Sequence, residues 1–163
     1  MIQPRWTHAG IAIACALLSS CAGDEVRPLH SLNKALVRSS EARRDPSLVQ
    51  GWLATLASRN GRERIELIDL RSGNPVATPG LNRADAQPVS ISLSSDGERL
   101  AVVQQRDGRT ELMLYRRSIA AVQRLEINPA GVPRHVSLNG DGRTLAVQVS
   151  RGGRWEVDII RLP

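Results

Sequence analysis

Residues 99–116 read RLAVVQQRDGRTELMLYR, and this stretch decides the fold. Two apolar runs, at residues 100–103 and 112–115, flank the dipeptide Asp107-Gly108. Asp-Gly between two such runs is a strong hairpin signal, because a type I′ turn requires positive φ at both of its central residues. The stretch therefore predicts two antiparallel strands joined by a two-residue turn.

The same hairpin pattern occurs twice more in the chain. The glycines that end the three turns are Gly61, Gly108 and Gly153, so the copies lie 47 and 45 residues apart. Glycine is favoured at this position because it reaches the left-handed region without the steric cost that other residues meet there. We therefore expect all three glycines to have a positive φ.

A second turn precedes the hairpin in the later two copies. It contains Asp96-Gly97 and Asp141-Gly142, and aspartate favours turns because its carboxylate accepts a hydrogen bond from nearby backbone. Weaker strand candidates follow the first two hairpins, at residues 76–78 and 122–127. Four strands in about 45 residues are typical of one blade of a β-propeller. The alternative is a generic antiparallel meander with chance similarity between its hairpins.

The repeats predict an all-β chain, a partial β-propeller of about three four-stranded antiparallel blades at approximately residues 32–80, 86–130 and 133–163. Closed propellers usually have about four to eight blades, and an open stack exposes sheet edges that invite pairing. Either a homodimer completes a six-bladed ring around a two-fold axis, or a short open domain covers its own edge. Because the third repeat ends after its third strand, we expect the ambiguous residues 31–37 to supply an outer strand.

The N-terminal segment contains a short apolar run, IAIACALL at residues 11–18, which is too short to span a bilayer as a helix. The four residues that end in Cys21, LSSC, resemble the lipobox of bacterial lipoprotein signals. The resemblance implies that residues 1–20 are a lipoprotein signal peptide, that the Cys21 sulfur carries a diacylglycerol, and that residues 21–31 are a lipidated tether. The alternative is an ordinary secretory signal with a cysteine near its cleavage site.

Membrane attachment follows from that resemblance. Acyl chains contribute roughly 0.8 kcal/mol for each buried CH₂, so two or more long chains hold a protein on a membrane almost permanently. Ala22 follows the cysteine, whereas lipoproteins of enteric bacteria that stay at the inner membrane have aspartate there. This residue favours the outer membrane.

The repeats also resemble a known family. Residues 94–116, SSDGERLAVVQQRDGRTELMLYR, and residues 139–161, NGDGRTLAVQVSRGGRWEVDIIR, are similar to blades of the TolB-type propeller, from the periplasmic Tol biopolymer-transport proteins. The sequence departs from the family at Ser95 and Gly140, where the family usually has proline, and the first repeat lacks the Asp-Gly turn. The resemblance implies a propeller fold and a place in the bacterial envelope.

Arginines flank all three hairpin turns. They are Arg59, Arg62, Arg106, Arg109, Arg151 and Arg154. In a propeller these turns lie on one rim, so the six side chains would form a basic face for an anionic partner such as a protein, glycan or lipid. The alternative is that exposed hairpins favour long charged side chains, which also protect edges from pairing.

The composition gives little support to other classes of function. The net charge is +6 and the basic residues are almost all arginine, which indicates either a compositional bias or an anionic partner. Aromatic residues are only 2% of the chain, too few for the stacking that single-stranded nucleic acids need. The sequence has no G-x-S-x-G motif and no metal-ligand spacing, and His135 has no sequence sign of a catalytic partner.

We therefore expect a protein that is not an enzyme, without cofactor, metal or nucleic acid. The sequence favours a lipid-anchored binding or scaffold module of the bacterial envelope that faces the periplasm. Two alternatives are an accessory domain of an envelope hydrolase and a degenerate propeller remnant without a partner. A polar triad in one cleft would favour the hydrolase.

Overall fold

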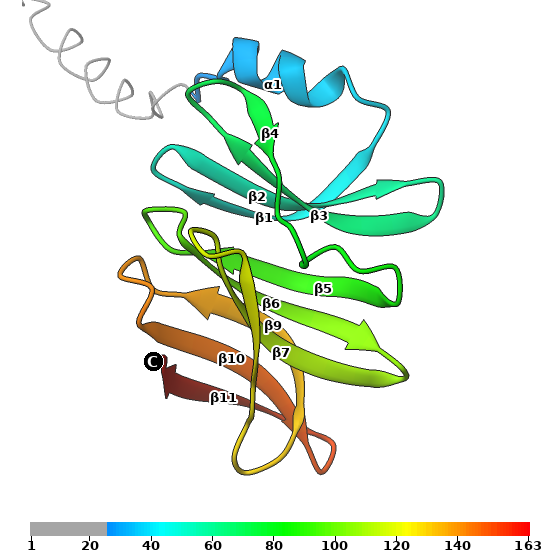
Figure 1. The fold of residues 1–163 in the computed structure, drawn as a ribbon, viewed down its shortest axis with the longest axis vertical. Helices are drawn as coiled ribbons and strands as arrows, with labels where there is room; N and C mark the ends of the chain where they lie inside the picture. Colours follow the sequence, from blue (N-terminus) through cyan, green and yellow to red (C-terminus); the bar gives the residue numbers. More distant parts are fainter. Residues whose placement is uncertain (1–25) are drawn as a thin grey trace, which may run out of the picture. The chain divides into compact units, whose positions relative to one another are not determined.

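The computed structural model describes residues 26–163, and the expected signal peptide and Cys21 lie outside this range. The described chain contains one helix, α1 (His30–Val37), followed by three antiparallel sheets (Figure 1). The first sheet has the strands β1 (Ala42–Val49), β2 (Trp52–Arg59), β3 (Arg62–Asp69) and β4 (Asn74–Val76). The second has β5 (Ala86–Leu93), β6 (Arg99–Arg106), β7 (Arg109–Arg116) and β8 (Ala121–Leu125). The third has β9 (Val132–Leu138), β10 (Thr144–Arg151) and β11 (Arg154–Arg161).

The all-β class and the three antiparallel sheets predicted from the sequence are confirmed. In each sheet the strands follow one another in chain order, because each is joined to the next by a short turn. The outer strands β4 and β8 overlap the predicted segments 76–78 and 122–127. None of the helices in residues 26–163 is long and apolar enough to cross a membrane.

The three hairpin turns have the predicted backbone. Gly61, Gly108 and Gly153 have φ of 74°, 73° and 78°. The residues before them also have positive φ, 53° at Asn60, 49° at Asp107 and 52° at Gly152. Positive φ at both central positions defines a type I′ turn, whose twist matches that of the strands it joins.

The Asp-Gly turns between the first two strands of a sheet also form as expected. Asp96 Oδ1 accepts a hydrogen bond of 2.9 Å from the N–H of Glu98. Asp141 Oδ1 accepts one of 2.8 Å from the N–H of Arg143. In the first sheet, the corresponding turn uses Gly51 with φ 80° instead. The two aspartates are therefore turn formers.

The second sheet is buried on both of its faces. On β7, Leu112 and Leu114 pack in a core with the third sheet, whereas Met113 and Tyr115 pack in a core with the first sheet. The side chains of a strand alternate between the two faces, so a central sheet needs an unbroken apolar run. This explains the sequence LMLY. Each fully buried leucine contributes roughly 1.5–3 kcal/mol relative to an exposed one.

The expectation of a strand at residues 31–37 is wrong, because these residues form most of the helix α1. Leu32 and Leu36 lie one helical turn apart and are half-buried, and Lys34 and Ala35 between them are good helix formers. Arg43 on β1 donates a hydrogen bond of 2.8 Å from Nη1 to the carbonyl of Leu36 at the helix end. The segment therefore lies beside the first sheet, and the third sheet has three strands.

Candidate functional site

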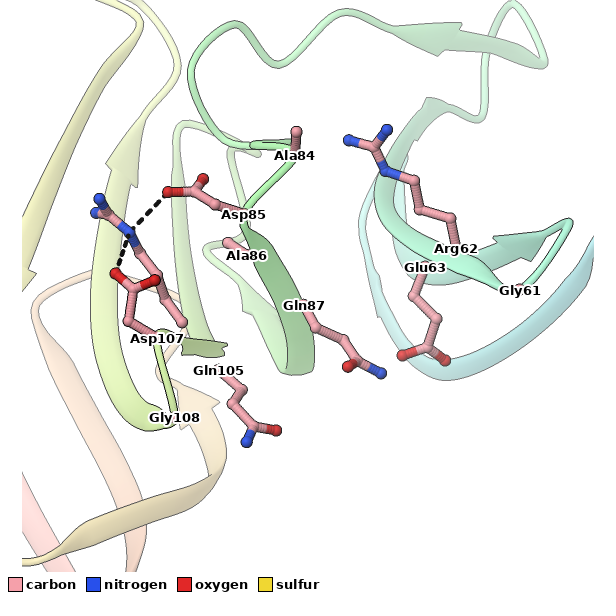
Figure 2. Close-up of a pocket in the computed structure, with 11 residues that line it drawn as sticks. Gly61, Arg62, Glu63, Ala84, Asp85, Ala86, Gln87, Gln105, Asp107 and Gly108 are labelled. Carbon is pink, nitrogen blue, oxygen red and sulfur yellow. Dashed lines mark ion pairs between the residues drawn. The ribbon is translucent and has the colours of Figure 1, made fainter.

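The three hairpin turns lie along the same edge of the sheets (Figure 1). The turns of the first two sheets also line one cavity of about 480 Å³, which contains Arg62, Arg106 and the segment 84–87 (Figure 2). We call the six arginines beside these turns the hairpin rim. The strand register explains how the rim is built, because each turn is closed by two directly opposed arginines. The pairs are Arg59 with Arg62, Arg106 with Arg109, and Arg151 with Arg154.

Two arginines directly opposite each other reduce the stability of a hairpin through charge repulsion. Like charges directly opposite each other on paired strands are destabilising, and such pairs are worth roughly 0.2–1 kcal/mol. Carboxylates relieve this repulsion in the second and third sheets but not in the first.

Arg106 is balanced by Asp85, from the loop before β5. The Arg106 Nε lies 2.9 Å from Asp85 Oδ2, an ion pair without hydrogen-bond geometry (Figure 2). Arg83 donates hydrogen bonds of 2.9 and 3.0 Å to the same carboxylate. The hydrogen bond from Arg83 and the charge of Arg106 lower the pKa of Asp85 from 3.8 to about 2. Asp85 therefore stays ionised across the physiological range.

Arg151 forms more hydrogen bonds to carboxylates than Arg106 does. Its guanidinium donates hydrogen bonds to Glu156 at 2.9 Å, to both carboxylate oxygens of Asp158, and to the carbonyl of Pro129 at 2.8 Å. The hydrogen bonds that Arg151 donates to Asp158 and Glu156 raise its pKa, and they in turn lower the pKa of Asp158. Arg151 thus ties the crossover between the second and third sheets to β11. This arginine supports the fold.

The other four rim arginines are exposed, and none forms an ion pair with a residue of the described range 26–163. They are Arg59, Arg62, Arg109 and Arg154. Two of them, Arg59 and Arg62, line a second cavity of about 290 Å³ together with Asn60, Arg64 and Asn82. No carboxylate from the described part of the chain, residues 26–163, lines this cavity.

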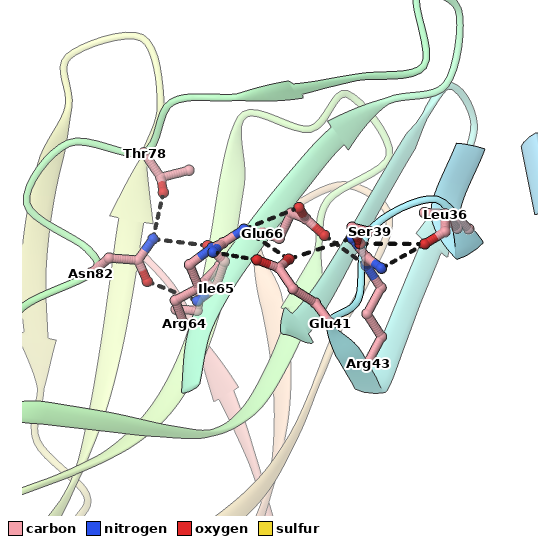
Figure 3. Close-up of polar contacts among 9 residues, drawn as sticks. All are labelled: Leu36, Ser39, Glu41, Arg43, Arg64, Ile65, Glu66, Thr78 and Asn82. Carbon is pink, nitrogen blue, oxygen red and sulfur yellow. Dashed lines mark hydrogen bonds and ion pairs between the residues drawn. The ribbon is translucent and has the colours of Figure 1, made fainter. Parts of the chain in front are cut away.

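The wall of that cavity is fixed by hydrogen bonds (Figure 3). Asn82 accepts a hydrogen bond of 2.7 Å from the N–H of Ile65 and donates one of 2.8 Å to its carbonyl. Arg64 donates two hydrogen bonds, of 2.9 and 3.0 Å, to Glu41. Arg59 and Arg62 can therefore direct their guanidinium groups to a phosphate or carboxylate, which a planar guanidinium binds with two parallel hydrogen bonds.

A second polar cluster lies where the first strands of the three sheets meet. Ser90 Oγ lies 2.9 Å from His135 Nδ1, and Asp45 Oδ1 lies 3.9 Å from the same nitrogen. A nucleophilic triad requires the serine and the carboxylate on different ring nitrogens. Ser90 is also only 1% exposed, which keeps its hydroxyl from a substrate. The cluster is therefore not the polar triad that would favour a hydrolase.

This cluster belongs to a ladder between the sheets. The N–H of Ile91 donates 2.7 Å to Asp45 Oδ2, and the N–H of Leu138 donates 2.9 Å to Ser92 Oγ. Polar side chains on the first strand of one sheet thus accept hydrogen bonds from edge N–H groups of the next sheet. Among residues 26–163, no group of three or more His, Cys, Asp or Glu side chains could hold a metal ion.

The sequence did not predict the carboxylates that form ion pairs with two of the rim arginines. Asp85 lies in a loop, and nothing in its sequence context points to the turn that it neutralises. Asp158 lies four residues beyond Arg154, and only the pairing of β10 with β11 brings it to Arg151.

No known family profile matches the sequence, and no curated protein is significantly similar to it. Solved structures do share its fold. TolB from Acinetobacter baumannii has a TM-score of 0.57 at 21% identity, covering 72% of this chain and 29% of TolB. A putative TolB from Agrobacterium tumefaciens has a TM-score of 0.59 at 13% identity, covering 76% of this chain and 46% of the other.

A prolyl endopeptidase has a TM-score of 0.53 at 11% identity, covering 82% of this chain and 24% of the enzyme. This chain thus spans less than half the length of each of these proteins. At such identities the likeness shows the fold alone. The three sheets form a partial β-propeller with the TolB-like fold, an architecture that serves several unrelated functions.

Proposed function

We propose that this protein is a non-enzymatic, lipid-anchored binding module of the bacterial envelope, with the hairpin rim as its binding surface. The observation that carries the proposal is the set of four exposed rim arginines that have no carboxylate partner among residues 26–163, two of which line one cavity. The partner is anionic: an envelope protein, an acidic glycan or a lipid headgroup.

The proposed anchor is the acylated Cys21, and the proposed location is the periplasmic side of a membrane, with the outer membrane favoured by Ala22. The likeness to TolB proteins supports an envelope location. An anchor also raises the local concentration of the module near its partners, so weak contacts at the rim suffice for binding.

The alternative of a hydrolase accessory domain is supported only by the fold shared with a prolyl endopeptidase. Fold likeness does not assign activity. The arrangement of Asp45, Ser90 and His135 adds no support, because the serine and the carboxylate share one ring nitrogen.

The rim can be tested with a charge-matched pair of variants. A basic residue near an anionic lipid surface contributes about 1 kcal/mol, so four arginines contribute about 4 kcal/mol, roughly a thousandfold in binding at low salt. In the chain carrying Cys21→Ser, we expect the replacement of all four free rim arginines by glutamine to weaken binding to phosphatidylglycerol vesicles by about this factor. Vesicle sedimentation measures the effect.

The control replaces four exposed arginines away from the rim, at Arg38, Arg71, Arg143 and Arg161, by glutamine. This control has the same net charge as the rim variant and should lose no more than about tenfold, because its arginines lie away from the rim that is proposed to face the vesicle. Equal losses in the two variants would show that net charge alone drives binding, and the rim proposal would then be wrong.

A further inference from the structure

One face of the third sheet is apolar, and none of the residues 26–163 covers it. Trp155, Val157 and Ile159 alternate along β11, so their side chains lie on the same face. They are 59%, 66% and 69% exposed. Large apolar side chains that lie together at a surface indicate an interaction site.

The repeats show what this face normally contacts. Counted from the hairpin turn, Val157 and Ile159 correspond to Leu112 and Leu114 on β7. Those two leucines are 1% and 0% exposed, because they pack against the third sheet. The same positions on β3 are buried in the core shared with the second sheet. In the first two sheets this face therefore packs on another sheet.

The central strand of the sheet adds uncharged side chains to this face. Ala146, Gln148 and Ser150 on β10 are the cross-strand partners of Ile159, Val157 and Trp155. We call these six residues the open face. None carries a charge, although the chain has a net charge of +6. A second copy can therefore approach through these six residues without meeting like charges, and Arg161, on the same face at the end of β11, lies beyond them.

The opposite end of the stack is closed. On the outer face of the first sheet, Thr55 and Ile68 are 2% and 4% exposed. Glu66 on the same face forms ion pairs with Arg43 at 2.8 Å and with Arg64 at 3.4 Å (Figure 3). A six-bladed ring would place the open face of one copy on this first-sheet face of the other. Because the outer face of the first sheet is already covered, it disfavours the contact needed for a six-bladed ring. The remaining possibility is a symmetric contact between two open faces.

We propose that the open face is a docking surface for a second copy of the chain, with third sheet packed on third sheet around a two-fold axis. Such an interface uses the same patch on both subunits, and two sheets pack face to face about 10 Å apart. The proposal does not depend on the hairpin rim or on the partner proposed for it.

The size of the face sets the strength of the dimer. Two strands of eight residues and one of seven cover at most about 26 by 14 Å, roughly 360 Å² on each copy. A standard stable interface buries about 800 Å² per partner. The dimer is therefore weak and reversible in solution, and anchoring of both copies to one membrane strengthens it by raising their effective concentration.

Sedimentation velocity tests the dimer. The full chain carrying Cys21→Ser, which has no lipid, should show a concentration-dependent equilibrium between monomer and dimer. Ile159→Lys should weaken this dimer at least about tenfold, because it places a charge from each copy in the apolar contact. Ile119→Lys is the control: this isoleucine is 64% exposed but lies in the turn between β7 and β8, and the variant should dimerise like the parent.

The side chain of Ile159 is exposed, so its replacement should leave the circular dichroism spectrum unchanged. A parent chain that stays monomeric at all concentrations would overturn the proposal. A dimer that persists in Ile159→Lys would also overturn it, because the contact would then not use the open face. Larger assemblies in the parent would overturn the closed two-fold contact.

Discussion

Replacing Gly97 by alanine is expected to destabilise the protein by about 2–5 kcal/mol, from a strained left-handed backbone and an overpacked core. The φ of Gly97 is +67°, and a Cβ built on it lies 2.7 Å from three atoms of the Trp52 ring. The ring cannot move away easily, because the Arg117 guanidinium stacks 4.5 Å from its centre. Arg117 also donates a hydrogen bond of 2.9 Å to the Gly97 carbonyl.

Urea denaturation that compares Gly97→Ala with Gly108→Ala separates the strain of the left-handed backbone from the overpacking of the core. Gly108 has a similar φ of +73°, but a Cβ there would meet no atom within 4 Å. Gly108→Ala should therefore cost only about 1–2 kcal/mol, the strain of the backbone alone. Equal losses for the two variants would mean that Trp52 does not pack against the Asp96-Gly97 turn.

The double replacement of Ser47 and Ser92 by alanine is expected to destabilise the protein by roughly 2–6 kcal/mol, because it leaves two edge N–H groups without a partner and each costs about 1–3 kcal/mol. The N–H of Leu93 donates 3.1 Å to Ser47 Oγ, and the N–H of Leu138 donates 2.9 Å to Ser92 Oγ. These bonds connect neighbouring sheets, so their loss weakens the stack as a whole.

Ser137 provides the matched control. It follows Ser92 by 45 residues and occupies the same place in the third repeat, but it is exposed. Ser137→Ala should change the free energy of unfolding by no more than about 0.5 kcal/mol. Thermal or urea unfolding compares the variants. A loss in Ser137→Ala as large as that in the double variant would contradict the role of the ladder.

The hairpins could be predicted because their signal is local. Two central residues with positive φ favour glycine, aspartate and asparagine, and the three turns contain these residue types. The unbroken apolar run of β7 likewise reflects a strand that is buried on both faces.

The first strand, β1, could not be recognised because its sequence, ARRDPSLV, has no apolar alternation. Its register shifts between Arg44 and Ser47, where Asp45 has a φ of 51°. Its polar side chains form hydrogen bonds and ion pairs rather than pack in a core: Asp45 accepts a hydrogen bond from the N–H of Ile91 in the second sheet, and Arg44 pairs with Glu63 within the first sheet at 2.7 Å. Such polar contacts do not produce the alternation of apolar and polar residues by which a strand is recognised in a sequence.

The ladder was missed for a related reason. Its members at one level are Asp45, Ser90 and His135, spaced by 45 residues but different in residue type. Each contributes a polar atom at the same place, so at this level the repeat is one of position and not of identity. At the next level, Ser47, Ser92 and Ser137 do repeat the same residue type. In residues 31–37, two leucines one helical turn apart also fit the alternation of a strand, and only the contact of Arg43 with the helix end distinguishes the two.

The claim that this propeller is an anchored envelope module rests on Cys21, and one measurement tests it most directly. The intact mass of the protein extracted from bacterial membranes should show the loss of residues 1–20 and the addition of a diacylglycerol and a further acyl group on Cys21. A Cys21→Ser variant should lack the adduct and leave the membrane fraction. A mass that shows Cys21 unmodified, or a Cys21→Ser protein that stays on the membrane as firmly as the parent, would contradict the account.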